Sequence, residues 1–251
     1  MKLSRTLALA LMVAVPAAAH AQINLAWNNC ITQASATDNV QYACNGTASG
    51  TVNLVASFIP PDALAGFVGA EMYLTIATEG GPLPDFWDLN FGGCRENSLY
   101  FPAYDNQTGT GTSGACQNPW SGSPSGGGFA FDLNYLGTGA TRIRTSRAIA
   151  YKRAMSAGQQ YHGGVFTLDF LNSAETENEP FCAGCCTPVT ITLTNVDVAQ
   201  EFGSPGGDVI HLTAPATRNV VTWNSLGCNG SSSIPTPTRK TSWGRIKATY
   251  R

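Results

Sequence analysis

The amino-acid sequence predicts an all-β fold: a disulfide-stabilised antiparallel β-sandwich, Ig-like or jelly-roll, with a short C-terminal amphipathic helix. Two observations predict the sheets. Apolar and polar residues alternate with a period of two, and 27 glycines and 14 prolines divide the 251 residues into short segments. A third observation, eight cysteines, predicts disulfide bonds. No strand pattern alternates with a long helical pattern, which argues against parallel βαβ folds.

The first 21 residues have the organisation of a secretory signal peptide. Lys2 and Arg5 precede an apolar run over residues 7–19, and Ala-His-Ala at 19–21 gives the small-x-small pattern that signal peptidase reads. The run is shorter than the about 20 residues that span a bilayer. We therefore expect cleavage near Ala21, no transmembrane segment, and secretion into the periplasm or the extracellular space.

Composition and charge narrow the class of domain and partner. With 43% hydrophobic and 10% aromatic residues, the chain has enough apolar material for a folded core. Loss of the signal peptide would remove two of the 14 basic residues and none of the 16 acidic ones, so the remainder is slightly acidic. That charge argues against nucleic-acid binding. We expect one sandwich domain over residues 22–234, then a Pro-spaced linker and a helix over residues 235–251.

Most of the domain has the pattern of strands. In FAFDLNY (129–135), four apolar residues alternate with small or polar ones, which is typical of a half-buried strand. FTLDF (166–170) repeats this pattern. Further strands are expected over residues 51–58, 69–78, 142–152, 189–198, 208–213 and 219–223.

The segment VTITLTNVDV (189–198) contains a shift of register. Its apolar residues fall into two sets that are out of step by one position: Val189, Ile191 and Leu193, then Val196 and Val198. One extra residue in a strand produces such a shift, so we expect a β-bulge near Thr194 and Asn195.

Other segments are expected to turn. SAGQQY (156–161) has the Gly-x-x-Tyr spacing of a tyrosine corner, in which a buried Tyr hydroxyl bonds to the upstream chain. A hairpin turn followed by a strand aromatic fits the same letters, and either makes Tyr161 structural. Residues 58–66 are expected to turn, with one helical turn at 62–65. Residues 103–128 form a long Gly/Ser/Thr-rich loop, pinned by Cys116.

Three cysteines fall in FCAGCC (181–186). Such a cluster can form structural disulfides, bind a metal ion or act as a redox dithiol. A haem anchor needs His directly after Cys185, where Cys186 stands. A redox Cys-x-x-Cys normally opens a helix, whereas Thr187 and Pro188 lead here into a strand. A zinc site would need adjacent ligands at 185 and 186, which strain a tetrahedron. An even cysteine count in an oxidising compartment favours disulfides, with no metal and no cofactor.

Proximity along the chain predicts the pairing Cys30–Cys44, Cys94–Cys116, Cys182–Cys185 and Cys186–Cys228. Cys182–Cys228 with one partner exchanged remains open, since eight cysteines allow 105 connectivities.

The end of the chain resembles a family of uncharacterised secreted bacterial proteins. The residues that carry the resemblance are CAGCCTPVTITL, then VTWN, and the terminal TPTRKTSWGRIKATYR. Members share a CAGC-x-x-PV core, a VTW strand and a closing TWG-x-[VI]-K-x-x-YR. The family places its third cysteine in the following strand, where this chain has Thr190, whereas here it is Cys186. The resemblance implies architecture and export, and no activity.

The terminal segment also carries its own pattern. Trp243, Ile246 and Tyr250 lie at helical spacing on one face, among five basic residues. Such a helix would pack on the protein's own sandwich or on an acidic partner or envelope surface.

Catalytic motifs are not found. The chain has no Gly-x-Ser-x-Gly, HExxH, P-loop or dinucleotide fingerprint. His162 and His211 are interpreted as structural or surface residues, because no nucleophile pattern accompanies them.

The best ligand-site candidate is LPDFWDLNFGGC (83–94). Asp85 and Asp88 flank Trp87, and Trp120 lies near the predicted Cys94–Cys116 loop. An apolar ring beside carboxylates matches a sugar face and its hydroxyls. Large aromatic side chains are mostly buried, however, which favours the alternative that Trp87 plugs the end of the sandwich.

Two classes of function follow. The first is an exported, non-catalytic structural, adhesion or partner-binding module. The second is a protein that binds or hydrolyses glycans through the Trp87 region. The expected partner is therefore a protein or glycan surface.

Overall fold

The computed structural model describes residues 22–42, 44, 50–101, 116–170, 182–213 and 218–228. The predicted signal peptide (1–21) and the predicted linker and helix (235–251) lie outside these residues. Over the described ranges the chain forms strands β1 to β11 and one 3-10 turn, η1 (Asp85–Trp87). No helix in these ranges is both long enough and apolar enough to cross a bilayer.

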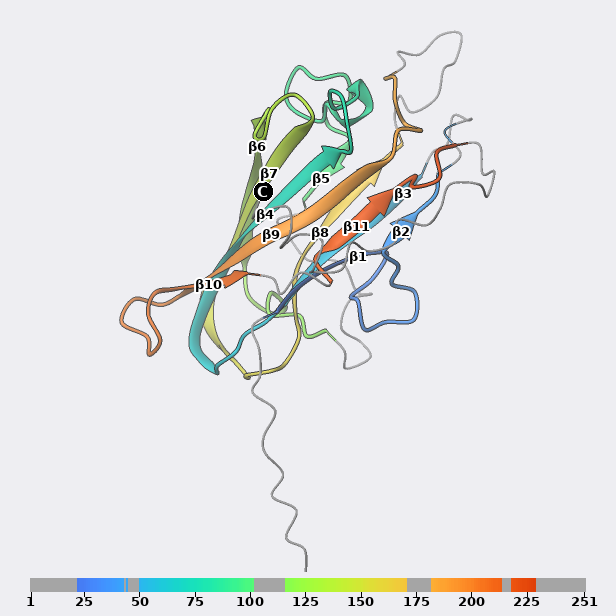
Figure 1. The fold of residues 1–251 in the computed structure, drawn as a ribbon. Coiled ribbons are helices and arrows are strands. Elements are labelled where there is room, and N and C mark those ends of the chain that lie inside the picture. Colours follow the sequence, from blue (N-terminus) through green and yellow to red (C-terminus); the bar gives the residue numbers. More distant parts are fainter. Residues whose placement is uncertain are drawn as a thin grey trace, which may run out of the picture.

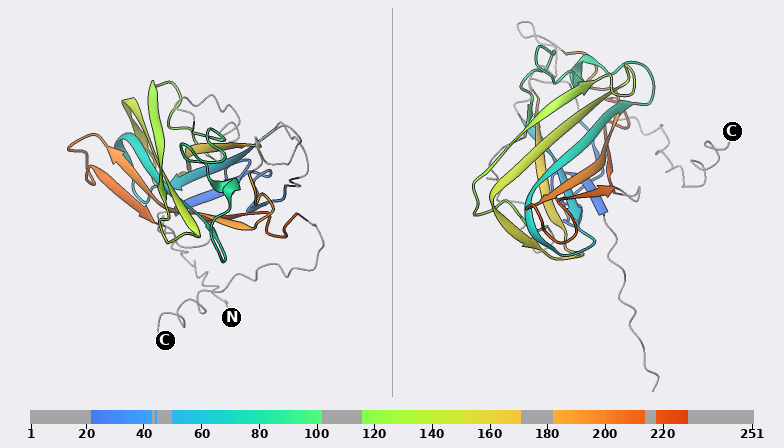
Figure 2. Two further views of the ribbon diagram at one scale, coloured as in Figure 1. Left: turned by 90° about the horizontal axis from the view of Figure 1, so that it is seen from above. Right: turned by 90° about the vertical axis from the view of Figure 1, so that its left-hand side faces the viewer.

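The strands form two sheets that pack face to face (Figures 1 and 2). The smaller sheet contains, in spatial order, β1 (Gln22–Trp27), β3 (Thr51–Ile59), β8 (Tyr161–Asp169) and β5 (Leu99–Tyr100). The larger sheet contains, in spatial order, β2 (Asn39–Val40), β11 (Val220–Trp223), β9 (Val189–Gln200), β4 (Leu64–Thr78), β7 (Ala140–Met155) and β6 (Ser125–Leu133). The short β10 (Val209–Thr213) also pairs with β9. All pairs are antiparallel except β2 with β11. The predicted disulfide-stabilised β-sandwich is confirmed.

The core lies between the two sheets and is built by alternation along each strand. In β4, Met72, Leu74 and Ile76 are buried, while Glu71 and Tyr73, at alternate positions, face the other side of the sheet. This period of two is what a strand requires when one face is packed and the other is wet. The larger sheet therefore has an inner face toward the core and an outer face toward solvent.

The bulge predicted in β9 is confirmed. Tyr73 of β4 pairs with Asn195 and Leu74 pairs with Leu193, so Thr194 is the extra residue. The Thr194 hydroxyl donates to the Tyr73 carbonyl over 3.0 Å, which partly replaces the interrupted ladder. The bulge keeps Val196 in the core beside Leu193. It also brings Asn195 and Asp197 to the outer face of the larger sheet.

The tyrosine corner is also confirmed, because the Tyr161 hydroxyl accepts a 2.7 Å hydrogen bond from the Ser156 amide.

Two other predictions about local structure are wrong. The helical turn at 62–65 does not form, since Leu64 already begins β4, buried and paired with Met155. The predicted 103–128 loop ends early, because β6 begins at Ser125 and its glycines pair with the long strand β7. Tertiary pairing here overrides the low strand propensity of glycine.

All described cysteines are disulfide-bonded, and most of the predicted pairing is wrong. Only Cys186–Cys228 is confirmed. The other bonds join residues that are far apart in the sequence: Cys30–Cys116, Cys44–Cys185 and Cys94–Cys182. Sheet topology, and not distance along the chain, sets which loops meet and hence which cysteines can pair. Sequence proximity was therefore the wrong criterion.

Three of these bonds radiate from FCAGCC, and we call them the disulfide hub: Cys94–Cys182, Cys44–Cys185 and Cys186–Cys228. The Cys185 carbonyl accepts hydrogen bonds from the Trp223 indole (2.8 Å) and the Asn224 amide (2.9 Å). Gly184 has a φ of +96°, and a Cβ there would lie 2.2 Å from Pro84 Cβ, so only glycine fits. The motif fastens three distant loops to one end of the sandwich.

A buried cation lies beside the hub. The Arg95 guanidinium stacks on the Phe86 ring, 3.9 Å from its centroid, and donates to the carbonyls of Phe86 and Asp169. Burial lowers the pKa of Arg95 to about 10, which still leaves it charged at neutral pH. Arg95 therefore links η1 to β8 as a structural element.

Candidate functional site

The structure does not bring Trp87 and Trp120 together. Trp87 is 1% exposed and packs against Trp223, whereas Trp120 is 2% exposed and packs against Phe67. Ile76, which lines the void beside Trp87, and Phe67 are nine residues apart on β4, on the order of 30 Å. The two tryptophans fill opposite ends of the core.

Neither ring can stack on a sugar. The void beside Trp87 measures about 10 Å³, no more than one water molecule requires. Asp85 is exposed on η1, while the Asp88 carboxylate accepts hydrogen bonds from the Asn90 amide (2.7 Å) and the Cys94 backbone (3.4 Å). Asp88 thus orders the loop that leads to the hub. Trp87 lies in the core, which fits the alternative that it fills the end of the sandwich.

The outer face of the larger sheet carries the polar side chains instead. Strand register places these residues in rows that cross the sheet. One row contains, in spatial order, Gly128, Ser146, Glu71, Asp197 and His211. The next row contains Ala130, Arg144, Tyr73, Asn195 and Thr213. Both rows depend on the β9 bulge, because without it Asn195 and Asp197 would face the core.

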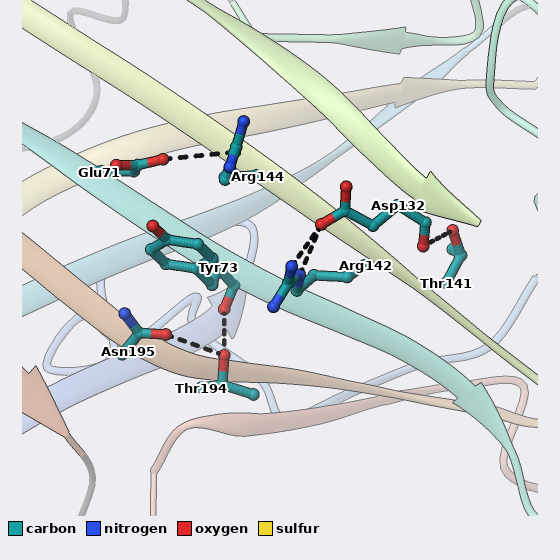
Figure 3. A network of polar contacts seen from close by, with 8 residues as sticks. All are labelled: Glu71, Tyr73, Asp132, Thr141, Arg142, Arg144, Thr194 and Asn195. Atoms are coloured by element: carbon teal, nitrogen blue, oxygen red, sulfur yellow. Dashed lines mark hydrogen bonds and ion pairs between the residues drawn. The ribbon is translucent and has the colours of Figure 1, made fainter. Parts of the chain in front are cut away.

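Figure 3 shows the contacts around Tyr73 on this face. The Glu71 carboxylate pairs with Arg144 over 3.4 Å, and Arg142 donates to Asp132 over 2.8 Å and 2.5 Å. The Arg142 guanidinium also lies 5.6 Å from the Tyr73 ring centroid. Charges on this face are therefore fixed in pairs, which orients them without burying them.

A second set of contacts continues toward β10. His211 Nδ1 lies 2.8 Å from Asp197 Oδ1, which also accepts a 3.1 Å hydrogen bond from the Asn195 amide. Partial burial and, next, the nearby Glu71 carboxylate raise the pKa of the Tyr73 phenol above its ordinary value. Tyr73 therefore stays a neutral hydrogen-bond donor well into the alkaline range.

Beside these rows the outer face is hollowed into a groove of about 560 Å³, which we call the outer groove. A cross-strand row of small residues forms its floor: Gly126, Ala148, Gly69 and Ala199. Glu71, Asp197 and His211 stand along one side. A Cβ on Gly69 would lie 2.6 Å from the Arg147 carbonyl oxygen, so this strand approach itself requires glycine.

The groove has features of a binding site. Glu71 and Asp197 are directly opposed on neighbouring strands, an arrangement that repulsion between like charges disfavours. Arg144 and the Asn195 amide offset part of that cost. Locally unfavourable arrangements that a fold retains are where function is expected. The opposed carboxylates offer acceptors to the N–H or O–H groups of a ligand.

Nucleophilic catalysis does not fit this geometry. Ser146 and His211 share a row, but β4 and β9 stand between them. Three strand spacings separate the two side chains by about 14 Å, far beyond hydrogen-bond reach.

Metal ligation finds little support among the described residues. The one group there with metal-ligand spacing is Cys44, Cys186 and Cys228, and all three thiols are oxidised in disulfides.

No protein-family model matches the chain, and no curated protein shows significant similarity to it. The sequence pattern pointed to the β9 bulge but not to the groove that the bulge helps to form. The groove residues come from five strands, and their shared signal is cross-strand register, which the sequence does not display. Gly69 falls in the strand expected over residues 69–78, whereas the glycines of β6 fall in the expected loop over residues 103–128.

Proposed function

We propose that this protein is an exported, non-catalytic module that binds a partner through the outer groove. The observation that carries the proposal is a hollow of about 560 Å³ on an otherwise well-paired sheet face, floored by small residues and flanked by oriented polar groups. A few fixed polar groups beside a concave surface are what recognition requires.

Export is supported by two features. Four disulfides fasten the domain, and disulfides persist in oxidising compartments such as the periplasm and the extracellular space. Gln22, which would become the N-terminus after cleavage near Ala21, already belongs to β1, so that cleavage would leave the described sandwich whole. The mature protein would then act outside the cytoplasm.

We favour a binding role over catalysis because the polar groups of the outer groove have hydrogen-bond or ion-pair partners and the groove lacks a paired nucleophile and base. Glu71 pairs with Arg144 and Asp197 pairs with His211, and Ser146 lies too far from His211 for that ring to activate its hydroxyl. Both can accept hydrogen bonds from a ligand while their own partners hold them in place.

Filling the groove tests the proposal. Ala148→Trp puts a large ring on the groove floor at an exposed position and should abolish retention of the purified protein on the surface of the producing cells. Thr190→Trp, on the same face but outside the groove lining, is the matched control and should be retained like the wild type. Equal retention of all three proteins would refute a role for the groove.

Glycan binding is a second candidate, and Tyr73 is the observation that favours it. Its half-buried ring lies on the outer face beside Glu71 and Asn195, which is the combination of an aromatic ring and polar groups that suits a sugar. A glycan array probed with wild type and Tyr73→Ala tests this candidate. Binding that disappears in Tyr73→Ala supports a sugar ligand, and an array without signal removes this candidate.

A further inference from the structure

The outermost strand of the larger sheet, β6, has an unusual edge. Among the described residues it pairs with β7 alone, and all nine of its residues are exposed or half-exposed. Figure 2 shows β6 at the margin of the sheet. Proteins commonly protect such edges with proline, lysine or bulges. The strand SGGGFAFDL has none of these, and its single charge, Asp132, is turned back to Arg142.

The ladder with β7 determines which backbone groups point away from the sheet. Ala150 donates to the Pro124 carbonyl over 2.9 Å, just before β6 begins. Antiparallel ladders alternate, so the even-numbered residues of β6 bond to β7. The amides and carbonyls of Gly127, Phe129 and Phe131 therefore point outward, along the free edge.

The edge also exposes apolar side chains. Phe129 is 39% and Leu133 55% exposed, and both lie on the same side of the strand as Phe131, which packs against the core. The rings of Phe129 and Phe131 are already ordered against each other, edge to face at 5.5 Å between centroids. A strand that added to this edge would cover them at little cost in conformational entropy.

The residue pattern of β6 fits a second β6 in antiparallel orientation. The first half of β6 contains three glycines, and the second half contains larger side chains. A two-fold axis through Phe129 would place the first half of each strand beside the second half of the other. Phe131 then lies across from Gly127 of the second copy, Asp132 lies across from Gly126, and the two Phe129 side chains meet. Large residues face glycines, and no like charges are opposed.

We propose that two copies of this chain associate through antiparallel pairing of their β6 strands, centred on Phe129, into one continuous sheet. The interface is isologous, so the assembly closes as a dimer. It joins the two outer faces and brings the groove residue Gly126 of each copy beside Asp132 of the other. This goes beyond the proposed function, since it holds whether or not the groove binds a partner.

Sedimentation equilibrium over a wide concentration range tests the association. The wild type should dimerise. Phe129→Lys sets two ammonium groups face to face and should weaken the dimer by at least about a hundredfold. Phe129→Pro removes an outward amide without touching the β7 ladder and should do the same. Phe202→Lys, a charge control at a 91% exposed position, should dimerise like the wild type. A wild type that stays monomeric, or a dimer that persists in both Phe129 variants, would overturn the proposal.

A cross-link tests the register. Opposed residues in a hydrogen-bonded antiparallel pair have Cα atoms about 5.5 Å apart, within disulfide range. Phe129→Cys should therefore link two chains under oxidising conditions. Phe131→Cys should not, because its own counterpart is four residues away along the partner strand. Cross-linking of Phe131→Cys alone, or of neither variant in a dimeric protein, rules out this pairing.

Discussion

The disulfide hub and the β6 edge lie at two different places on the larger sheet and differ in how firmly they are held. At the hub, three bonds fasten distant loops around Trp223, whose ring contacts Trp27, Tyr42, Phe86, Trp87 and Phe170. At the β6 edge, the described residues contain no cross-link, and Phe129 and Leu133 are exposed. Disulfide bonds and contacts between aromatic rings are thus concentrated at the end of the sandwich where several loops meet.

The difference indicates how stability and recognition are divided in this molecule. A region that is held from several directions can keep its shape when neighbouring surfaces change. A strand with an open edge and small residues beside it can accept a new neighbour without rearranging the core. Stability should therefore depend on the hub, and association on the β6 edge and the outer face.

Removing a hub bond should have the largest effect. The Cys44–Cys185 bond closes a sequence separation of 141 residues, so Cys44→Ala with Cys185→Ala should lower the free energy of unfolding by about 5 kcal/mol. The shorter Cys186–Cys228 loop, with a separation of 42, should cost about 4 kcal/mol when its cysteines are replaced. Urea unfolding followed by fluorescence measures both. A loss below about 1 kcal/mol from the longer loop would contradict the role assigned to the hub.

Aromatic substitutions should separate the two regions next. Trp223→Ala removes the fully buried ring at the hub and should cost about 3–5 kcal/mol of unfolding free energy. Phe129→Ala removes an exposed ring and should change the stability of the monomer by no more than about 0.5 kcal/mol. Thermal unfolding at low concentration gives both values. Equal losses would remove the distinction between hub and edge.

The smallest effect concerns the outer face. Burial and the Glu71 carboxylate raise the pKa of Tyr73, so Glu71→Gln should lower that pKa while leaving the contribution of burial. A pKa raised by folding means that stability falls as the pH rises past the ordinary phenol value, about 10. The variant should lose less stability over that alkaline range. An NMR titration of labelled tyrosine rings measures the pKa, and an unchanged value would show that Glu71 does not act on Tyr73.

Local patterns in the sequence predicted the local features of the fold. The one-residue shift in β9 led to the bulge at Thr194, and the Gly-x-x-Tyr spacing fitted the corner at Tyr161. Both are encoded within a few residues by alternation or turn chemistry. The same logic failed for Gly126–Gly128, where strand β7 imposes an extended conformation that glycine alone does not favour.

Features that depend on contacts between distant parts of the chain, namely the disulfide pairing and the outer groove, could not be predicted from the sequence. Cys94, in the loop after η1, meets Cys182, just before β9, although the two cysteines are 88 residues apart in the sequence. Likewise the outer groove exists because Gly69, Ala148 and Ala199 fall in one cross-strand row. Neither fact can be read without the strand order. The neighbours of Trp87 in the chain, Asp85 and Asp88, suggest a ligand site, whereas its neighbours in space are other core aromatics.

Amide hydrogen exchange at low and high protein concentration tests the division between hub and edge most directly. The hub-end amides of Leu193 and Thr222, bonded to the Asn219 and Asp38 carbonyls, should be protected at both concentrations. The amides of Gly127, Phe129 and Phe131 should exchange rapidly in dilute solution and become protected at high concentration, while those of Gly128 and Ala130 stay protected by β7 throughout. Exchange at Phe129 that is independent of concentration, or hub-end amides that exchange faster than β6, would contradict the account.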